Sequence, residues 1–234
     1  MTCEANLMFL ILDEGITLHT KARRSLRKDG IYSNAIRSCL FTRFGLKNKT
    51  AQDQFWACLP VDFDTYKQVT IANGDRIRAA DHQGQPEGDT DCRDATFVRV
   101  GNYLTPQTPS LNLIPPTQYS LLRDVYERIP SREPVFKGAE YFGQLKTILV
   151  TELPPGIVPA ITQPKRVVLV AIDPRDTTNE TSLDIPYYTE PSKPVAPRVV
   201  DINTVMCLVG RIKDRGQWAV IDRSGDLARA DFVD

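Results

Sequence analysis

The chain has 234 residues, of which 41% are hydrophobic and 25% are charged, and its 29 basic residues balance 29 acidic ones. This composition supports a folded core and the length suits one domain with an extra segment or two small domains. Zero formal net charge excludes a global electrostatic attraction to nucleic acid or to an anionic membrane, so such binding would need a local patch.

Residues 1–60 are predicted to form a helical, basic N-terminal segment. Residues 7–12 (LMFLIL) are too few for a secretory signal or a membrane span, and we expect a buried strand or a helical turn. Apolar residues then recur at helical spacing between Ile31 and Leu40. If the basic residues before them are also helical, Lys21, Arg24 and Lys28 share one face. This basic cluster consists of Lys21, Arg23, Arg24, Arg27 and Lys28.

Residues 61–234 are predicted to be β-rich. Apolar and polar residues alternate on both sides of Asn73-Gly74, a pair that adopts the positive φ angles of a tight turn, which predicts a hairpin over residues 66–81. A strand is expected over residues 95–104, with Val98 and Val100 on one face. A short amphipathic helix is expected to begin near Thr117.

Two proline-rich segments, at residues 105–117 and 174–197, are predicted to be loops. Further strands are expected over residues 141–153, 166–172, 199–202, 204–212 and 217–222, with a hairpin turn at 214–216. Residues 166–172 (RVVLVAI) are apolar on both faces, which is typical of a central strand. The pattern predicts a β-rich α+β fold: a small barrel-like or rolled antiparallel sheet with a helical N-terminal segment. We expect one β core holding Val168, Val170, Ile172, Trp218 and Val220.

Two groups of residues are candidates for binding. The basic cluster at 21–28 can contact DNA phosphates without reading sequence, or it is the solvated face of a helix. Aromatic side chains either line a reader pocket, for which Tyr141, Phe142 and Trp218 are the main candidates, or simply fill the core. The other aromatic residues considered with them are Phe97, Tyr103, Tyr187 and Tyr188.

Catalytic and metal-binding patterns are weak in this sequence. No phosphate-binding loop and no GxSxG pattern occurs, and Glu87, Asp89, Asp91 and Asp94 do not match a calcium loop. Five widely spaced cysteines without a CxxC pattern indicate reduced thiols in an intracellular protein. We therefore expect no metal, no small-molecule cofactor and no membrane association.

Asp173 is the sharpest enzymatic candidate, because it ends the apolar strand 167–172. Ribonuclease-H-like nucleases and transposases resemble this arrangement, with a first-strand aspartate that holds a divalent metal. Two-metal chemistry needs several converging carboxylates, which the sequence does not place, and Pro174 favours a turn at the strand end. A metal-dependent nuclease centred on Asp173 is thus the alternative reading, and a non-enzymatic domain is the preferred one.

Four segments resemble, in order and spacing, a domain of unknown function that follows the transposase region in CACTA-type (En/Spm-like) transposon proteins, in its fungal version. They are residues 73–78 (NGDRIR), 93–99 (RDATFVR), 141–145 (YFGQL) and 218–228 (WAVIDRSGDLA). The resemblance covers about residues 66–230, whereas residues 1–60 match no family. It implies a mobile-element origin, a possible nuclear role and no catalytic residues, since the catalytic core would lie outside this chain.

Three hypotheses follow. The first is an accessory interaction domain that contacts DNA, chromatin or a transposase core. The second is the nuclease centred on Asp173. The third is a translated relic of a transposon that folds but has no present activity.

Overall fold

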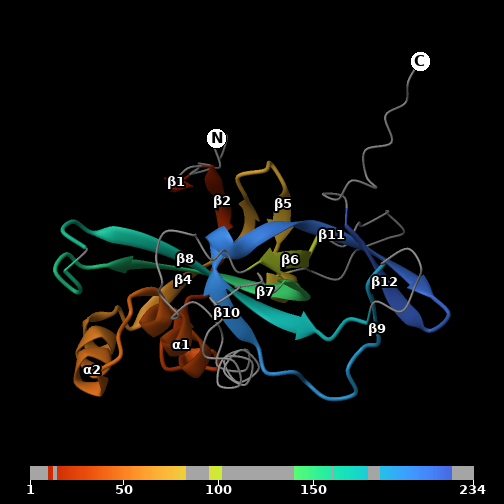
Figure 1. The fold of residues 1–234 in the computed structure, drawn as a ribbon. Coiled ribbons are helices and arrows are strands. Elements are labelled where there is room, and N and C mark those ends of the chain that lie inside the picture. The colour runs from red at the N-terminus through yellow and green to blue at the C-terminus, as the bar shows by residue number, and fades with distance from the viewer. Residues whose placement is uncertain are drawn as a thin grey trace, which may run out of the picture.

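The computed structural model describes residues 10–12, 15–82, 95–101, 140–159, 161–178 and 185–222. Twelve strands in these residues form one antiparallel sheet, along which the main order is β1-β2-β4-β7-β6-β11-β12-β9 (Figure 1). The predicted β-rich antiparallel fold with helices near the N-terminus is confirmed, and the sheet is not closed into a barrel. The strands are β1 (Leu10–Leu12), β2 (Ile16–Lys21), β3 (Leu26–Arg27), β4 (Asp62–Thr70), β5 (Arg76–Arg78), β6 (Phe97–Gly101), β7 (Glu140–Leu153), β8 (Lys165–Arg175), β9 (Tyr187–Tyr188), β10 (Arg198–Asp201), β11 (Val205–Asp214) and β12 (Gln217–Asp222).

The long hairpin of β7 and β8 lies at the centre of the sheet. Its pairing runs from Leu153↔Lys165 to Phe142↔Arg175, with one register shift between Leu145 and Thr147. Both faces of β8 are buried, because alternate residues of the strand belong to two different apolar clusters. The prediction of a central strand covered on both sides is therefore confirmed.

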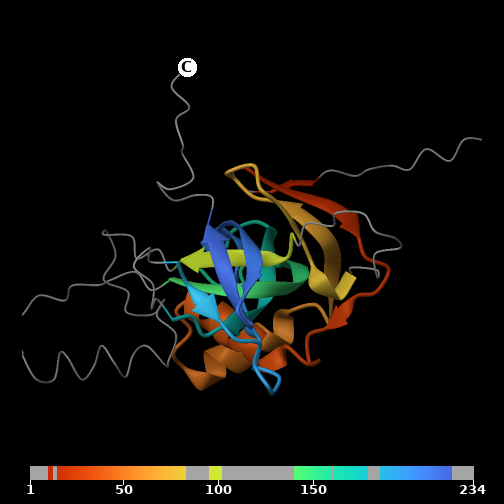
Figure 2. The same ribbon diagram turned by 90° about the vertical axis from the view of Figure 1, so that its right-hand side faces the viewer.

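Two α-helices in the described residues cover one face of this hairpin (Figures 1 and 2). They are α1 (Ser33–Arg43) and α2 (Lys49–Cys58), and the side chain of Asn48 caps α2 by accepting a hydrogen bond from Thr50 N at 2.9 Å. Both helices bury apolar side chains against Leu149, Leu153, Val167 and Leu169, and an ion pair between Arg43 and Asp201 ties α1 to β10. The helical character expected for part of residues 1–60 is thus present in α1 and α2.

The expectation that the basic cluster lies on a helix is wrong. Lys21 ends β2 opposite Tyr66, and Arg27 lies in β3 opposite Asp62, so both strands pair with β4. Between them Ala22 N donates to Thr65 O at 2.7 Å. Because β4 supplies partners for the backbone of this stretch, pairing with the sheet overrides the helical pattern of the sequence.

The hairpin predicted at Asn73-Gly74 is confirmed. In its ladder Val69 lies opposite Ile77, and the turn is closed by hydrogen bonds from Ile71 N to Asp75 O and from Gly74 N to Ile71 O, at 3.0 and 2.9 Å. Gly74 has φ +90°, which explains why glycine stands at this position. A short 3-10 turn, η1 (Ala80–His82), follows β5.

The apolar residues form three clusters, so the expected single β core is only partly correct. Val168, Val170 and Ile172 lie in one cluster together with Val98 and Val100 from β6. Val220 and the half-buried Trp218 belong instead to a cluster with Phe97, Tyr188, Cys207 and Val209. The reason is topological: β12 pairs with β11 and β9, and β11 pairs with β6, which puts β12 beyond β6 and away from β8.

The hairpin between β11 and β12 turns at Arg215 and Gly216, with φ +46° and +87°, as predicted for residues 214–216. A second 3-10 turn, η3 (Ile202–Thr204), joins β10 to β11. Within the described part of the chain, no helix is long and apolar enough to cross a membrane. Cys39 and Cys58 are free thiols, and Cys207 Sγ donates a hydrogen bond to Asp222 Oδ1 at 3.5 Å. Several predictions lie outside the described residues: the loop at 105–117, the helix near Thr117, the acidic stretch 87–94 and residues 223–228.

Candidate functional site

Lys28, one of the DNA-contact candidates, is buried at the end of α2. Its Nζ donates hydrogen bonds to the backbone oxygens of Trp56 and Leu59, each at 2.9 Å. These carbonyls lie at the C-terminal end of the helix, where oxygens lack intrahelical donors and the helix dipole is negative. Lys28 therefore holds the helix end and does not present its charge at the surface.

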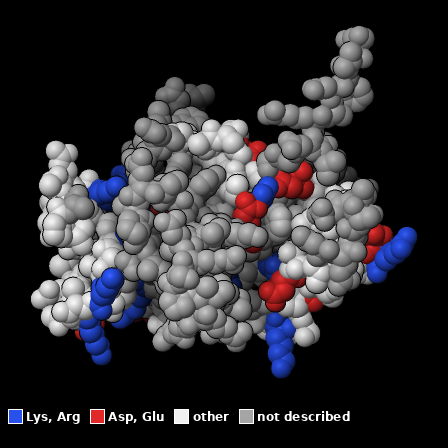
Figure 3. All heavy atoms as spheres, in the orientation of Figure 1, with Lys and Arg blue, Asp and Glu red and all other residues white. Residues whose placement is uncertain are grey.

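The other members of the basic cluster are exposed but dispersed. Lys21 pairs with Asp64 at 2.7 Å, and the backbone oxygen of Arg24 accepts a hydrogen bond from Thr65. Arg23, Arg24 and Arg27 are exposed, and Arg27 lies in β3, which pairs with β4. Contact of these three side chains with DNA stays a prediction. On the face seen in Figure 3 the described basic side chains are scattered among acidic ones and do not gather into a patch.

Tyr141, Phe142 and Trp218 do not line one pocket. Tyr141 and Phe142 are successive residues of β7 and point to opposite faces of the sheet. Tyr141 packs against the cluster that holds Val170, below Arg198, whose Cζ lies 5.0 Å from the ring centroid, and burial raises the pKa of Tyr141 to about 12. Phe142 and Trp218 pack against the cluster that holds Phe97. Tyr103 lies outside the described residues.

Two arginines and three aromatic rings come together beside β6, and we name this group the arginine–aromatic cluster: Phe97, Arg175, Tyr188, Arg211 and Trp218. The Cζ atom of Arg211 lies 3.7 Å from the ring centroid of Phe97 and 4.5 Å from that of Trp218. The rings of Phe97 and Tyr188 are stacked, with centroids 6.0 Å apart, and Arg175 Cζ lies 5.8 and 6.0 Å from them. Such contacts hold guanidinium groups over the negative faces of the rings.

Glu190 bridges the two arginines of this cluster. Its Oε1 lies 3.2 Å from Arg211 Nη1, and its Oε2 lies 3.4 Å from Arg175 Nη2. Arg211 Nη1 also donates to the hydroxyl of Tyr188 at 2.7 Å. Burial raises the pKa of Tyr188, and the neighbouring Arg211 opposes that shift. The arrangement is a pair of desolvated cations that shares one carboxylate.

Asp173 lies on β8 opposite Gln144, half-buried. Burial raises the pKa of its carboxyl, Lys146 and Arg175 lower it, and Asp81 raises it further. Asp81 in turn lies 3.4 Å from Lys146 Nζ. Among the described residues, no group of three or more His, Cys, Asp or Glu side chains is placed to hold a metal ion.

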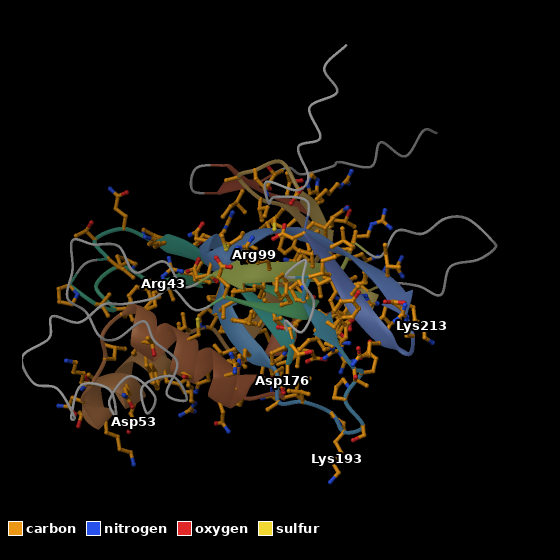
Figure 4. All side chains as sticks on the ribbon, turned by 45° about the vertical axis from the view of Figure 1, so that its right-hand side comes forward. Arg43, Asp53, Arg99, Asp176, Lys193 and Lys213 are labelled. Atoms are coloured by element: carbon orange, nitrogen blue, oxygen red, sulfur yellow. The ribbon has the colours of Figure 1, made fainter. Side chains whose placement is uncertain are left out.

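The segments that carry the resemblance contact one another across the sheet. Arg99 pairs with Glu140, directly before the YFGQL segment, through a 2.9 Å hydrogen bond from Nε, and with Asp222 of the last strand at 2.5 Å from Nη1. Figure 4 shows Arg99 lying over the sheet near β6 and β11. The hairpin segment reaches residues 93–99 through a hydrogen bond from Arg78 N to Ala95 O at 2.8 Å, and residues 97–99 pair with residues 142–144. Outside the four segments, Asn73 Nδ2 donates to Met206 O at 3.0 Å and Asp75 Oδ2 accepts from Leu208 N at 2.7 Å.

Sequence reasoning missed the two arginines of the cluster, although it named Phe97, Tyr188 and Trp218 as aromatic candidates. One signal was present: Arg211 follows Val209 at the two-residue spacing of a strand face, so it lies on the side of β11 that faces the buried aromatic residues. Arg175 and Glu190 gave no such signal, because both lie in the proline-rich segment 174–197. The expectation that this whole segment is a loop is wrong, since β8 runs to Arg175 and β9 lies within the segment. Neither the family models nor the curated proteins nor the solved structures contain a match to this chain.

Proposed function

We propose that this chain is a non-catalytic accessory domain of a transposable-element protein and that it works by binding a partner, either a transposase core, DNA or chromatin. The single observation that supports this most is the set of contacts among the four segments that resemble the transposon-associated domain. The proposal takes these contacts as the signature of one shared fold, and it assigns no reaction to the residues that make them.

The chemistry of these segments is used inside the fold. Asn73 and Asp75 fasten the β4–β5 hairpin to β11, and Arg99 joins β6 to β7 and β12. Gly143 of YFGQL permits the close approach of β8, since a Cβ atom there would lie 2.5 Å from Ile172 Cγ2 and 2.7 Å from Asp173 O. These residues stabilise the fold through hydrogen bonds, ion pairs and close packing, and the proposal assigns them no reaction.

The nuclease alternative centred on Asp173 is less favoured. The nearby positive charges are Lys146 and Arg175: both lower the pKa of Asp173, and Lys146 also pairs with Asp81. A divalent cation placed there would be repelled by both. DNA cleavage assays with Mg²⁺ and Mn²⁺ test this directly: we expect no cleavage, and cleavage that disappears in Asp173→Ala would establish the alternative.

The accessory role is tested by co-purification of the full chain with the transposase region encoded by the same element. Stable co-purification is expected, with the unrelated exposed variant Glu152→Gln as a control that leaves it unchanged. Terminal inverted repeats and an upstream transposase around the reading frame would support the origin. If the origin holds and neither the transposase region, DNA nor nucleosomes bind, the chain is a relic without this activity.

A further inference from the structure

We propose that Arg175 and Arg211 form a binding site for a carboxylate side chain on an acidic segment of a partner protein, and that Glu190 is the chain's own occupant of this site. The inference rests on the proposed binding role and names the chemistry of the partner. It assigns Glu190 a second task, which is to compete with the partner for the two arginines.

The position of Glu190 shows that the site accepts a carboxylate. Each of its two oxygens faces a different guanidinium, at 3.2 Å for Arg211 and 3.4 Å for Arg175. Carboxylates and arginine form the strongest of the common side-chain hydrogen bonds, because both partners are charged and planar. The arginines themselves are held in place by Phe97, Tyr188 and Trp218, so the site exists before a ligand arrives.

The burial of the three charged groups differs in a way that makes Glu190 replaceable. The side chains of Arg175 and Arg211 are 10% and 14% exposed, whereas that of Glu190 is 48% exposed. Glu190 lies in a stretch, residues 189–196, in which every residue is exposed and none belongs to a helix or strand. Nε of Arg175 is buried and has no hydrogen-bond partner in the described part of the chain, so Glu190 does not use all the donors of the site.

The surroundings favour a protein ligand over a nucleic acid. The positive charge of Arg175 lowers the pKa of the nearby Asp173 carboxyl, and Asp214 accepts a hydrogen bond from Tyr187 at 3.3 Å on the neighbouring hairpin. Together with Glu190 these acidic groups would repel the successive phosphates of a nucleic acid strand. A protein segment brings a single carboxylate with apolar neighbours, and the half-buried Trp218 beside Arg211 offers them a contact surface.

The test measures the binding of a fluorescein-labelled peptide that carries one glutamate between apolar residues to the full chain by fluorescence anisotropy. In Glu190→Gln the internal competitor loses its charge while the side-chain shape is kept, so we expect binding at least about tenfold tighter than in wild type, equivalent to about 1.4 kcal/mol. The matched control is Glu152→Gln, which removes an exposed carboxylate paired with Arg166 at 3.9 Å on the far end of the β7–β8 hairpin, and it should leave binding unchanged.

A second readout follows the arginines themselves. In the Glu190→Gln protein, the Nε–Hε NMR signals of Arg175 and Arg211 should shift on addition of the peptide while that of Arg166 does not. Arg211→Lys in the same background keeps the charge but loses the planar, two-nitrogen contact, and it should return the affinity to the wild-type level or below. The melting curve of the protein with Arg211→Lys shows whether the fold is retained. If the fold is lost, the NMR titration of the Glu190→Gln protein alone tests the proposed site.

Equal peptide affinity in wild type and Glu190→Gln, or equal shifts at all three arginines, would overturn the proposal. So would a DNA duplex or inorganic phosphate that binds Glu190→Gln more tightly than the peptide does. These outcomes are separable from failure of the accessory role. If the peptide binds as expected and no transposase region does, only the accessory role fails. If that region binds and is indifferent to both substitutions, only the carboxylate site fails.

Discussion

Lys28 shows how a charge that looks available in the sequence is used inside the molecule. Its ammonium satisfies two backbone oxygens at the end of α2 and lies 5.7 Å from the ring centroid of Trp56. The exposed Lys21, seven positions earlier, makes one ion pair with Asp64. Lys28 and Lys21 therefore contribute differently to the free energy of unfolding, because only Lys28 is buried and hydrogen-bonded to the backbone.

Replacement of Lys28 by methionine should lower the free energy of unfolding by about 1–3 kcal/mol, because two buried carbonyl oxygens lose their donor. Urea denaturation measures the change. Lys21→Met is the matched control, since an exposed ion pair is worth about 0–1 kcal/mol. Equal effects of the two substitutions would mean that the Lys28 hydrogen bonds contribute no more than a surface pair.

Gly143 is required by the close approach of β7 and β8. The Cβ atom of Gly143→Ala would overlap Ile172 and the backbone oxygen of Asp173, so we expect a loss of about 1–3 kcal/mol in the free energy of unfolding. Gly210→Ala is the control, because its Cβ would find its nearest neighbour, Ile221 Cβ, at an ordinary 3.7 Å. Similar melting temperatures for the two variants would contradict this explanation of the YFGQL glycine.

Among the elements, β8 packs against apolar clusters on both of its faces. Val170→Asp should abolish soluble expression, because an unpaired buried charge costs several kcal/mol, comparable with a total stability of about 5–15 kcal/mol. Val61→Asp, at a side chain that is 55% exposed, is the control and should change stability by no more than about 0.5 kcal/mol. Unchanged melting of Val170→Asp would disprove the placement of β8 at the centre.

The elements that the sequence pattern predicted well are those with a strong local signal. The Asn73-Gly74 hairpin, the doubly apolar strand 166–172 and the helix around Ile36 and Leu40 all have one, and all are present. The stretch 21–28 was predicted wrongly, because its spacing fits a helix while its structure is decided by pairing with β4, more than thirty residues later.

The arginine–aromatic cluster was beyond prediction for a related reason. Phe97, Arg175, Tyr188 and Arg211 come from four different strands, β6, β8, β9 and β11. Their proximity follows from strand order, which no local pattern encodes. Sequence analysis could name the aromatic members, yet only the topology supplies the cations that lie over them.

For the molecule as a whole, the central question is whether the N-terminal segment is integrated or is an unpacked relic. Both helices bury apolar side chains against β7 and β8, so Arg37 and Arg43 of α1 should resist trypsin longer than Arg215, whose side chain in the β11–β12 turn is 94% exposed. Mass spectrometry of a digestion time course measures the order. Cleavage in α1 before Arg215 would favour an unpacked N-terminal segment.

We propose that the chain binds a partner and performs no chemistry. Biolayer interferometry of the immobilised full chain against the transposase region of the same element tests it most directly, with nucleosomes and a DNA duplex with Mg²⁺ as parallel arms. We predict saturable binding of the transposase region with a dissociation constant of about 1 μM or below, a free energy of about −8 kcal/mol, and intact DNA. No saturable binding to any of the proposed partners, or DNA cleavage that depends on Asp173, would contradict the account.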